Sequence, residues 1–374
     1  MGLRILHLLN HLPNIGNGIV NVTVDLICSQ HGQGHEVTVA SAGGELEAVL
    51  AEQGIEHHYL DPRKNLLTAM AALRKLRLLV LEFQPDIVHV HMMAGALLAR
   101  TARPGLRYRI VSTVHNEFQR SAVLMGLADR VIAVSGNVKQ NLIQRGIGHA
   151  RIDVVRNGSI GSVRRQFAAA AVPPALARPA IVTVAGLYHR KGIADLIDGF
   201  ASIAAEHPAA HLYIVGNGPD REEFKARAQR HDCSARIHFE GFQPDVHAYL
   251  RSADIFVLAS HREPFGLVLA EAREAGLAII GTRVDGIPEV LEDGARGLLV
   301  PSSDPPAIAA ALGELLASPK VLAEWKSRAS TNTNWLHVDR MATETTAVYE
   351  RCLSRAVAAQ TTGDARSPIR SIVD

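Results

Sequence analysis

Two acidic residues flank a turn that suits a phosphate-containing ligand. Glu263 opens the segment Glu263-Pro-Phe-Gly-Leu-Val-Leu-Ala-Glu271, which follows the apolar run 255–259 after three polar residues. This order predicts a buried strand, a glycine-containing turn and a helix. The first turn of such a helix offers free backbone N–H groups and a partial positive charge, which suit a pyrophosphate. Because carboxylates accept paired hydrogen bonds from vicinal hydroxyls, we expect the two acids to hold the two sugars of one nucleotide sugar.

Short apolar runs alternate with longer helical patterns along most of the chain. Expected strands lie at 4–9, 36–40, 87–91, 110–115 and 131–135 in the first half, and at 180–185, 210–215, 236–239, 254–259, 278–281 and 297–300 in the second. Alternation of this kind predicts an α/β fold with parallel sheets. Ligands bind beyond the carboxyl ends of such strands, so two doubly wound, Rossmann-like domains would face each other across a cleft.

A loss of periodicity after residue 158, with more Ala, Pro and Arg, marks the domain boundary. The predicted parts are an N-terminal domain (1–160), a linker (161–179), a C-terminal domain (180–335), a helix packing back on the N-terminal domain (336–358) and a flexible tail (359–374).

Composition excludes several classes of protein. The chain has 374 residues with 47% hydrophobic residues, and 39 basic against 37 acidic side chains give a net charge of +2, so we expect no nucleic-acid partner. Three widely spaced cysteines argue against a disulfide framework or a cysteine zinc site and favour the cytoplasm. No apolar run is long enough to cross a bilayer.

The region 62–109 is locally basic, and within it the stretch 62–79 interleaves basic and apolar residues at roughly helical spacing. Such a pattern predicts peripheral contact with anionic lipid at the inner face of the membrane. The alternative is a solvated basic face on a helix whose apolar stripe packs in the core.

Taken together, the motifs resemble the retaining group 1 glycosyltransferases, family four, which have the GT-B architecture. The matching pieces occur in family order over nearly the whole chain: Gly16-Asn-Gly18, Gly34-His-Glu-Val37, Asp86-Ile-Val-His-Val-His91, Thr113-Val-His115, 128–135, Asn157-Gly158, Lys191-Gly192, Gly216-Asn-Gly-Pro219, Phe239-Glu-Gly241, 263–271, 286–290 and 297–300.

The resemblance implies transfer of a sugar from a nucleotide-diphosphate sugar, such as a UDP- or GDP-sugar, to an acceptor hydroxyl with retention of anomeric configuration. The acceptor would be a sugar or a lipid-linked glycan, and the pathway cell-surface polysaccharide, lipopolysaccharide or glycolipid biosynthesis. The C-terminal domain would hold the donor and the N-terminal domain the acceptor. Enzymes of this type usually need no metal or other cofactor.

Residue roles follow from the same resemblance. Glu271 would bond the ribose hydroxyls, Glu263 the donor sugar, and Lys191 would stabilise the negative charge that develops on the leaving diphosphate. Backbone amides near the phosphates would come from Phe265, Gly266 and Leu267.

Four further positions are candidates for the site. His115 is expected near the reacting sugar, although a strand-end histidine bonded to backbone has the same sequence pattern. Gly16 and Gly18 follow the first strand and allow close approach to a ligand, or serve as plain turn glycines. Gly216 belongs to a turn whose composition has low specificity.

The sequence departs from the family pattern at two places. Gly186 stands where an arginine often pairs with the lysine, which makes Arg190 the candidate replacement, and Asn116 follows His115. The first departure keeps open a catalytically weak nucleotide-sugar-binding homologue.

A metal-dependent amidohydrolase is the remaining alternative, because His89-Val-His91 resembles the metal-binding pair of that class. Amidohydrolases have a single β/α barrel.

Overall fold

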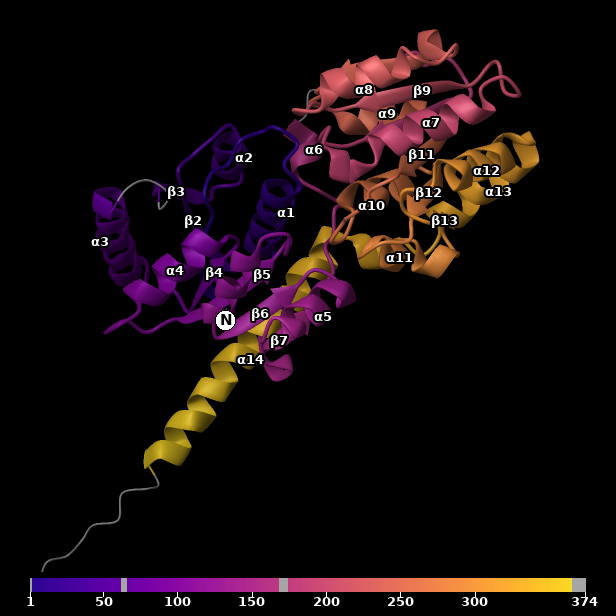
Figure 1. Ribbon diagram of the computed structural model, residues 1–374. Helices are drawn as coiled ribbons and strands as arrows, with labels where there is room; N and C mark the ends of the chain where they lie inside the picture. The colour runs from indigo at the N-terminus through magenta and orange to yellow at the C-terminus, as the bar shows by residue number, and fades with distance from the viewer. Residues whose placement is uncertain (1, 62–65, 168–173, 365–374) are drawn as a thin grey trace, which may run out of the picture.

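The chain folds into two α/β domains joined by a linker (Figure 1). The computed structural model describes residues 2–61, 66–167 and 174–364. Each domain is built on its own parallel sheet, as the alternating sequence pattern predicts. The α/β fold class with two Rossmann-like domains is therefore confirmed, and the single barrel of an amidohydrolase is excluded.

The N-terminal sheet has seven strands in the order β3-β2-β1-β4-β5-β6-β7. Its strands are β1 (Arg4–Leu8), β2 (Glu36–Ser41), β3 (Glu56–Tyr59), β4 (Ile87–Val90), β5 (Arg109–Val114), β6 (Arg130–Ala133) and β7 (Ile152–Val154). The connecting helices are α1 (Gly18–Gly32), α2 (Glu47–Glu52), α3 (Leu66–Phe83), α4 (Met93–Ala102) and α5 (Gly136–Gln144). Strand order reverses between β1 and β4, and the loops after these strands diverge there to leave room for a ligand.

The C-terminal sheet has six strands in the order β10-β9-β8-β11-β12-β13. Its strands are β8 (Ala180–Val184), β9 (His211–Val215), β10 (Ile237–Gly241), β11 (Ile255–Leu258), β12 (Ala278–Thr282) and β13 (Leu298–Val300). The helices are α7 (Ile193–Ile203), α8 (Arg221–Ala228), α9 (Val246–Ser252), α10 (Leu267–Glu274), α11 (Ile287–Val290), α12 (Pro305–Leu316) and α13 (Pro319–Ser330). Here the order reverses between β8 and β11.

Burial explains why these segments form their elements. Every residue of β4 and of β11 is buried, because helices cover both faces of a parallel sheet, and this accounts for their continuous apolar sequences. In α7 the buried residues Ile193, Leu196, Ile197 and Phe200 recur at helical spacing and face the core that the helix shares with α12.

The chain passes between the domains twice, and the two crossings are bonded to each other. Ile160 pairs with His337 in an isolated parallel bridge, in which the Ile160 oxygen accepts from the Val338 amide at 3.0 Å. A Cβ at position 158 would lie 2.4 Å from the His337 oxygen, so only glycine permits this approach. The helix α6 (Arg164–Phe167) lies in the predicted linker, of which residues 168–173 are outside the described ranges.

After the second crossing, α14 (Val338–Asp364) runs back along the N-terminal domain, where it packs on α1 (Figure 1). The predicted end of this helix at 358 is wrong, because α14 continues to Asp364. Ala and Gln extend a helix readily and the nearest proline comes later, at Pro368, so nothing ends the helix at 358. Residues 365–374 lie outside the described part.

Among the helices of the described ranges, none alone has the length and apolar composition needed to cross a bilayer; α12 and α13 meet these criteria only as a pair bent by 105°.

Candidate active site

A pocket of about 380 Å³ lies between the two domains, where the loops after the strands of both sheets meet. All of the residues predicted for the site line it: Gly16, Gly18, His115, Arg190, Lys191, Gly216, Glu263, Phe265, Gly266, Leu267 and Glu271. They come from loops that are far apart in the sequence, so the fold brings every candidate to one place.

Lys191 and Glu263 form an ion pair in the wall of the pocket, and each side chain is 14% exposed. Lys191 ends a short 3₁₀ turn after β8, and Glu263 lies in the loop between β11 and α10. The Glu263 amide donates to Asp285 at 2.9 Å, which fixes the loop. The ammonium is thus held in place by a carboxylate that a bound ligand can share or replace.

The start of α10 faces the pocket. Gly266 caps the helix with φ of +90°, a left-handed conformation that few side chains adopt. The ring of Phe265 is buried and meets Trp335 edge-on at 6.4 Å, so it anchors the turn from below. Phe265 lines the pocket, and its ring is part of the core.

Glu271 lies on the same helix and is partly buried. Burial raises the pKa of its carboxyl, and the neighbouring guanidiniums of Arg165 and Arg164 oppose this shift. Arg164 is itself bound to Asp25 of α1, donating to its two oxygens at 2.9 and 2.8 Å. Asp25 and Arg164 line the pocket but were missed by sequence reasoning, because a pair separated by 139 positions has no local pattern.

The space beside Gly186 is occupied by an aromatic ring. A Cβ at this position would lie 2.9 Å from Cε2 of Tyr188. The Arg190 guanidinium stacks near Tyr188 at 5.5 Å and near Phe118, from the other domain, at 5.1 Å. The pocket wall therefore contains an arginine, but this arginine is residue 190 and not residue 186. Its guanidinium stacks on two aromatic rings.

His115 follows β5, and its Nε2 lies 3.2 Å from Nδ1 of His91. Its contact is thus with another side chain, and not with the backbone as the alternative interpretation expected. Burial lowers the pKa of His115 to about 4, which keeps the ring neutral. Its Nδ1 is buried without a hydrogen-bond partner in the described part of the chain.

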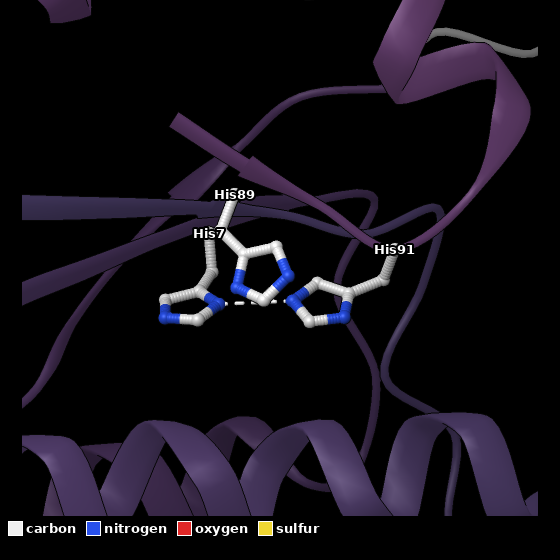
Figure 2. Close-up of side chains that lie close together, drawn as sticks. All are labelled: His7, His89 and His91. Carbon is white, nitrogen blue, oxygen red and sulfur yellow. Dashed lines mark hydrogen bonds between the residues drawn. The ribbon is translucent and has the colours of Figure 1, made fainter. Parts of the chain in front are cut away.

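Three further histidines, His7, His89 and His91, lie close together (Figure 2), and His91 contacts His115. Their ring nitrogens approach within 4.8 Å of one another, close enough to hold a metal ion. Every one of these nitrogens already has a protein partner, however: Gln30, His91, Tyr349, Thr113, Thr23 and His115 supply them. A metal would have to break this network to gain its ligands.

Two family models match consecutive parts of the chain. The model of glycosyltransferase family 4 matches residues 16–159, and that of the group 1 glycosyl transferases matches residues 165–332. The chain belongs to the group 1 glycosyltransferases. The boundary between the two matched regions coincides with the first crossing between the domains.

Several known proteins are similar to most of this glycosyltransferase. It is 29% identical to glycogen synthase of Mycobacterium tuberculosis over 71% of this chain and 69% of the relative. It is 27% identical to phosphatidyl-myo-inositol mannosyltransferase of Mycolicibacterium smegmatis over 94% and 95% of the two chains. Anabaena Alr3699/HepE in complex with UDP superposes with a TM-score of 0.78 at 19% identity, covering 93% of this chain and all of that one, so the fold is GT-B.

The buried histidines predict a stability that depends on pH. Burial lowers the pKa of His7 from 6.5 to about 4. Between these pH values the His7 ring is protonated in the unfolded chain and neutral in the folded chain. The free energy of unfolding should fall as the pH drops from 6.5 towards 4, by about 3 kcal/mol for His7 alone. Urea denaturation at several pH values measures this slope.

His7→Gln should flatten the slope, whereas His149→Gln, at an exposed position, should leave it unchanged. Equal slopes in the wild type and both variants would show that His7 does not carry the effect.

Proposed function

We propose that this glycosyltransferase moves a sugar from a nucleotide-diphosphate sugar to an acceptor hydroxyl with retention of anomeric configuration. The observation that carries the proposal is the arrangement of Glu271, the start of α10 and the Lys191–Glu263 pair along one pocket between the domains. Anabaena Alr3699/HepE, with the same fold, is known in complex with UDP-glucose, which supports a donor of this class.

Each part of the donor has a matching element in the pocket. Glu271 would bond the ribose, and the amides at Gly266 and Leu267 would face the diphosphate together with the helix dipole. Lys191 and Arg190 would balance the charge that builds up as the sugar–phosphate bond breaks, and we propose that these cations make a metal unnecessary. Glu263 would exchange part of its bond with Lys191 for the hydroxyls of the donor sugar.

Retention suits this geometry if the acceptor attacks from the face that the diphosphate leaves. The leaving phosphate would then accept the proton of the acceptor hydroxyl. We assign Glu263 to contacts with the donor sugar and with Lys191, and not to a role as covalent nucleophile. Catalysis would depend on positioning, on charge stabilisation and on the exclusion of water when the two domains enclose the donor.

The donor roles can be separated by two substitutions. Lys191→Ala should lower kcat by about 10²–10³-fold with a smaller effect on donor affinity, because its charge matters most in the transition state. Glu271→Gln should weaken donor binding by about tenfold or more, because a charged hydrogen bond is lost. Release of nucleoside diphosphate from a panel of UDP- and GDP-sugars, with acceptors, measures turnover, and calorimetry measures affinity.

Lys320→Ala and Glu206→Gln, at exposed positions outside the pocket, are the matched controls. If affinity and turnover responded in the reverse way, the two roles would be misassigned. Binding of a nucleotide sugar without release under any condition would instead identify a passive nucleotide-sugar receptor.

We propose that Arg190 replaces the arginine missing at Gly186. Arg190→Ala should lower kcat by about tenfold or more, because one cation near the diphosphate is lost. Arg262→Ala is the matched control, since Arg262 stacks on the same Phe118 ring at 5.4 Å but does not line the pocket. Steady-state kinetics of the two variants test whether Arg190 has this role.

A double substitution, Gly186→Arg with Tyr188→Gly, frees the space beside position 186 and should restore part of the activity of Arg190→Ala. Equal activity of Arg190→Ala and the wild type would contradict the replacement.

We further propose that the enzyme works in the cytoplasm on a glycan or lipid-linked acceptor and touches the inner face of the membrane through α3. Its cysteines are buried and unbridged, which suits a reducing compartment. Arg74 and Lys75 are exposed on α3 beside the exposed apolar residues Met70, Leu78 and Leu81. A relative, lipopolysaccharide core glycosyltransferase LpsE of Rhizobium meliloti, is 28% identical over 51% of this chain, and it supports an envelope glycan pathway.

Flotation with liposomes containing anionic lipid tests this contact. Arg74→Glu with Lys75→Glu should abolish flotation, whereas Arg230→Glu with Lys320→Glu in the other domain should not. Arg77 is left unchanged, because it donates to the carbonyls of Ala102 and Pro104 and holds the adjoining loop. Equal flotation of both variants, or no flotation of the wild type, would contradict the proposed membrane contact. Arg63 and Lys64 of the basic region lie outside the described residues.

A further inference from the structure

A continuous chain of hydrogen bonds links the pocket to the C-terminal helix through buried side chains. His115 contacts His91 at 3.2 Å, His91 contacts His7 at 2.9 Å, and His7 contacts Gln30 of α1 at 2.9 Å. Figure 2 shows the bond between His7 and His91, with the ring of His89 beside them. Gln30 also contacts Tyr349 of α14 at 3.2 Å.

The histidine rings in this series of hydrogen bonds are neutral, so each hydrogen bond has a defined donor and acceptor. Burial lowers the pKa of His7, His91 and His115 below the ordinary value. A neutral imidazole has one N–H group and one lone pair, so a ring that donates through one nitrogen must accept through the other. The direction of the first bond therefore sets the direction of all that follow.

Gln30 supplies the first direction. Its oxygen Oε1 faces Nε2 of His7, so His7 donates there and accepts at Nδ1. Nε2 of His91 then donates to His7, and Nδ1 of His91 accepts from Nε2 of His115. Thr23 lies 3.3 Å from the same His91 nitrogen but gives its own proton to the Ile19 carbonyl, so it does not compete.

A second branch begins at the other end of the Gln30 carboxamide and is coupled to the same orientation. Its Nε2 donates to the hydroxyl of Tyr349, which donates in turn to Nδ1 of His89 at 2.6 Å. Nε2 of His89 donates to Thr113 at 2.8 Å. If the carboxamide turned over, both branches would reverse and the proton of His115 would move from Nε2 to Nδ1.

At the pocket end of this series of hydrogen bonds, one ring nitrogen has no bonding partner among the described residues. Nδ1 of His115 is buried and has no partner within the described residues, and His115 lines the pocket. In the direction set by Gln30, this nitrogen has a lone pair, which accepts a hydrogen bond from a hydroxyl group. With the direction reversed it would present an N–H group.

We propose that Gln30 and Tyr349 are positioning residues that hold His115 in its Nε2–H tautomer, so that Nδ1 accepts a hydrogen bond from a hydroxyl of the sugar bound in the pocket. This inference rests on the proposed function, because the sugar is the ligand that provides the hydroxyl. It assigns a role at the active site to a tyrosine on the helix that follows the donor-binding domain.

Nitrogen NMR of protein labelled with ¹⁵N-histidine tests the inference without turnover, because protonated and unprotonated ring nitrogens resonate far apart. The wild type should show His115 protonated at Nε2 and bare at Nδ1, with the signals assigned by loss in His115→Gln. A bound UDP- or GDP-sugar should shift the Nδ1 resonance. Protonation at Nδ1, or an Nδ1 signal that does not respond to a bound nucleotide sugar, would overturn the inference.

Substitutions test the origin of the tautomer. Tyr349→Phe frees the carboxamide and should give a mixture of His115 tautomers, with kcat lower by about tenfold, the value of one buried hydrogen bond. Gln30→Glu keeps an acceptor for His7 and should preserve the wild-type tautomer, whereas Gln30→Met should not. Tyr108→Phe is the matched control, since its buried hydroxyl donates to the Ala99 carbonyl at 2.7 Å, away from the histidines.

The inference would be contradicted if Tyr108→Phe and Tyr349→Phe lost activity equally and the tautomer of His115 stayed unchanged in both. Tyr349 would then have only a structural role. A wild type that binds nucleotide sugars with the expected tautomer and Nδ1 shift, yet transfers no sugar, would contradict the proposed function and leave this inference standing.

Discussion

The bonded pair of chain crossings is the constraint on which the rest of the structure depends. Where Ile160 leaves the N-terminal domain and His337 returns to it, the two backbones are joined as neighbouring strands are. This junction turns the carboxyl ends of the two sheets towards each other, and those ends supply the lining of the pocket. Without it, the loops after β5 and β8 would belong to separate surfaces, and His115 could not face Lys191 across one cavity.

A charged contact between the two domains adds to this constraint. Glu289 of the C-terminal domain accepts from the Gly136 amide at 2.7 Å, at the start of α5, and binds Arg156 at 2.8 Å. A carboxylate at a helix start is stabilised by the helix dipole. The two domains are thus held together at one edge by backbone bonds and at another by an acid–helix contact, while the pocket between them stays open to a ligand.

Local patterns made much of the site predictable from the sequence. The segment 263–271 carries its own strand, turn and helix signals, and Lys191 stands at a turn of recognisable composition, so both were placed correctly in one pocket. Pairs that meet only through tertiary packing gave no such signal. Asp25 with Arg164, and Gln30 with Tyr349, are separated by 139 and 319 positions, and neither partner belongs to a motif. The predicted end of the last helix at 358 is too early for a different reason, because residues 359–364 have no apolar pattern that would indicate a helix and yet continue α14.

The return of α14 to the first domain makes the two halves of the enzyme topologically inseparable. A single cut between the sheets would deprive α1 of its covering helix and expose the side of the N-terminal core on which Tyr349 is buried. Each lobe is compact, yet only the donor lobe is a continuous stretch of chain. Recombination that exchanges donor lobes between related enzymes must therefore replace an internal segment and keep both ends of the recipient, so that the acceptor lobe retains its own final helix.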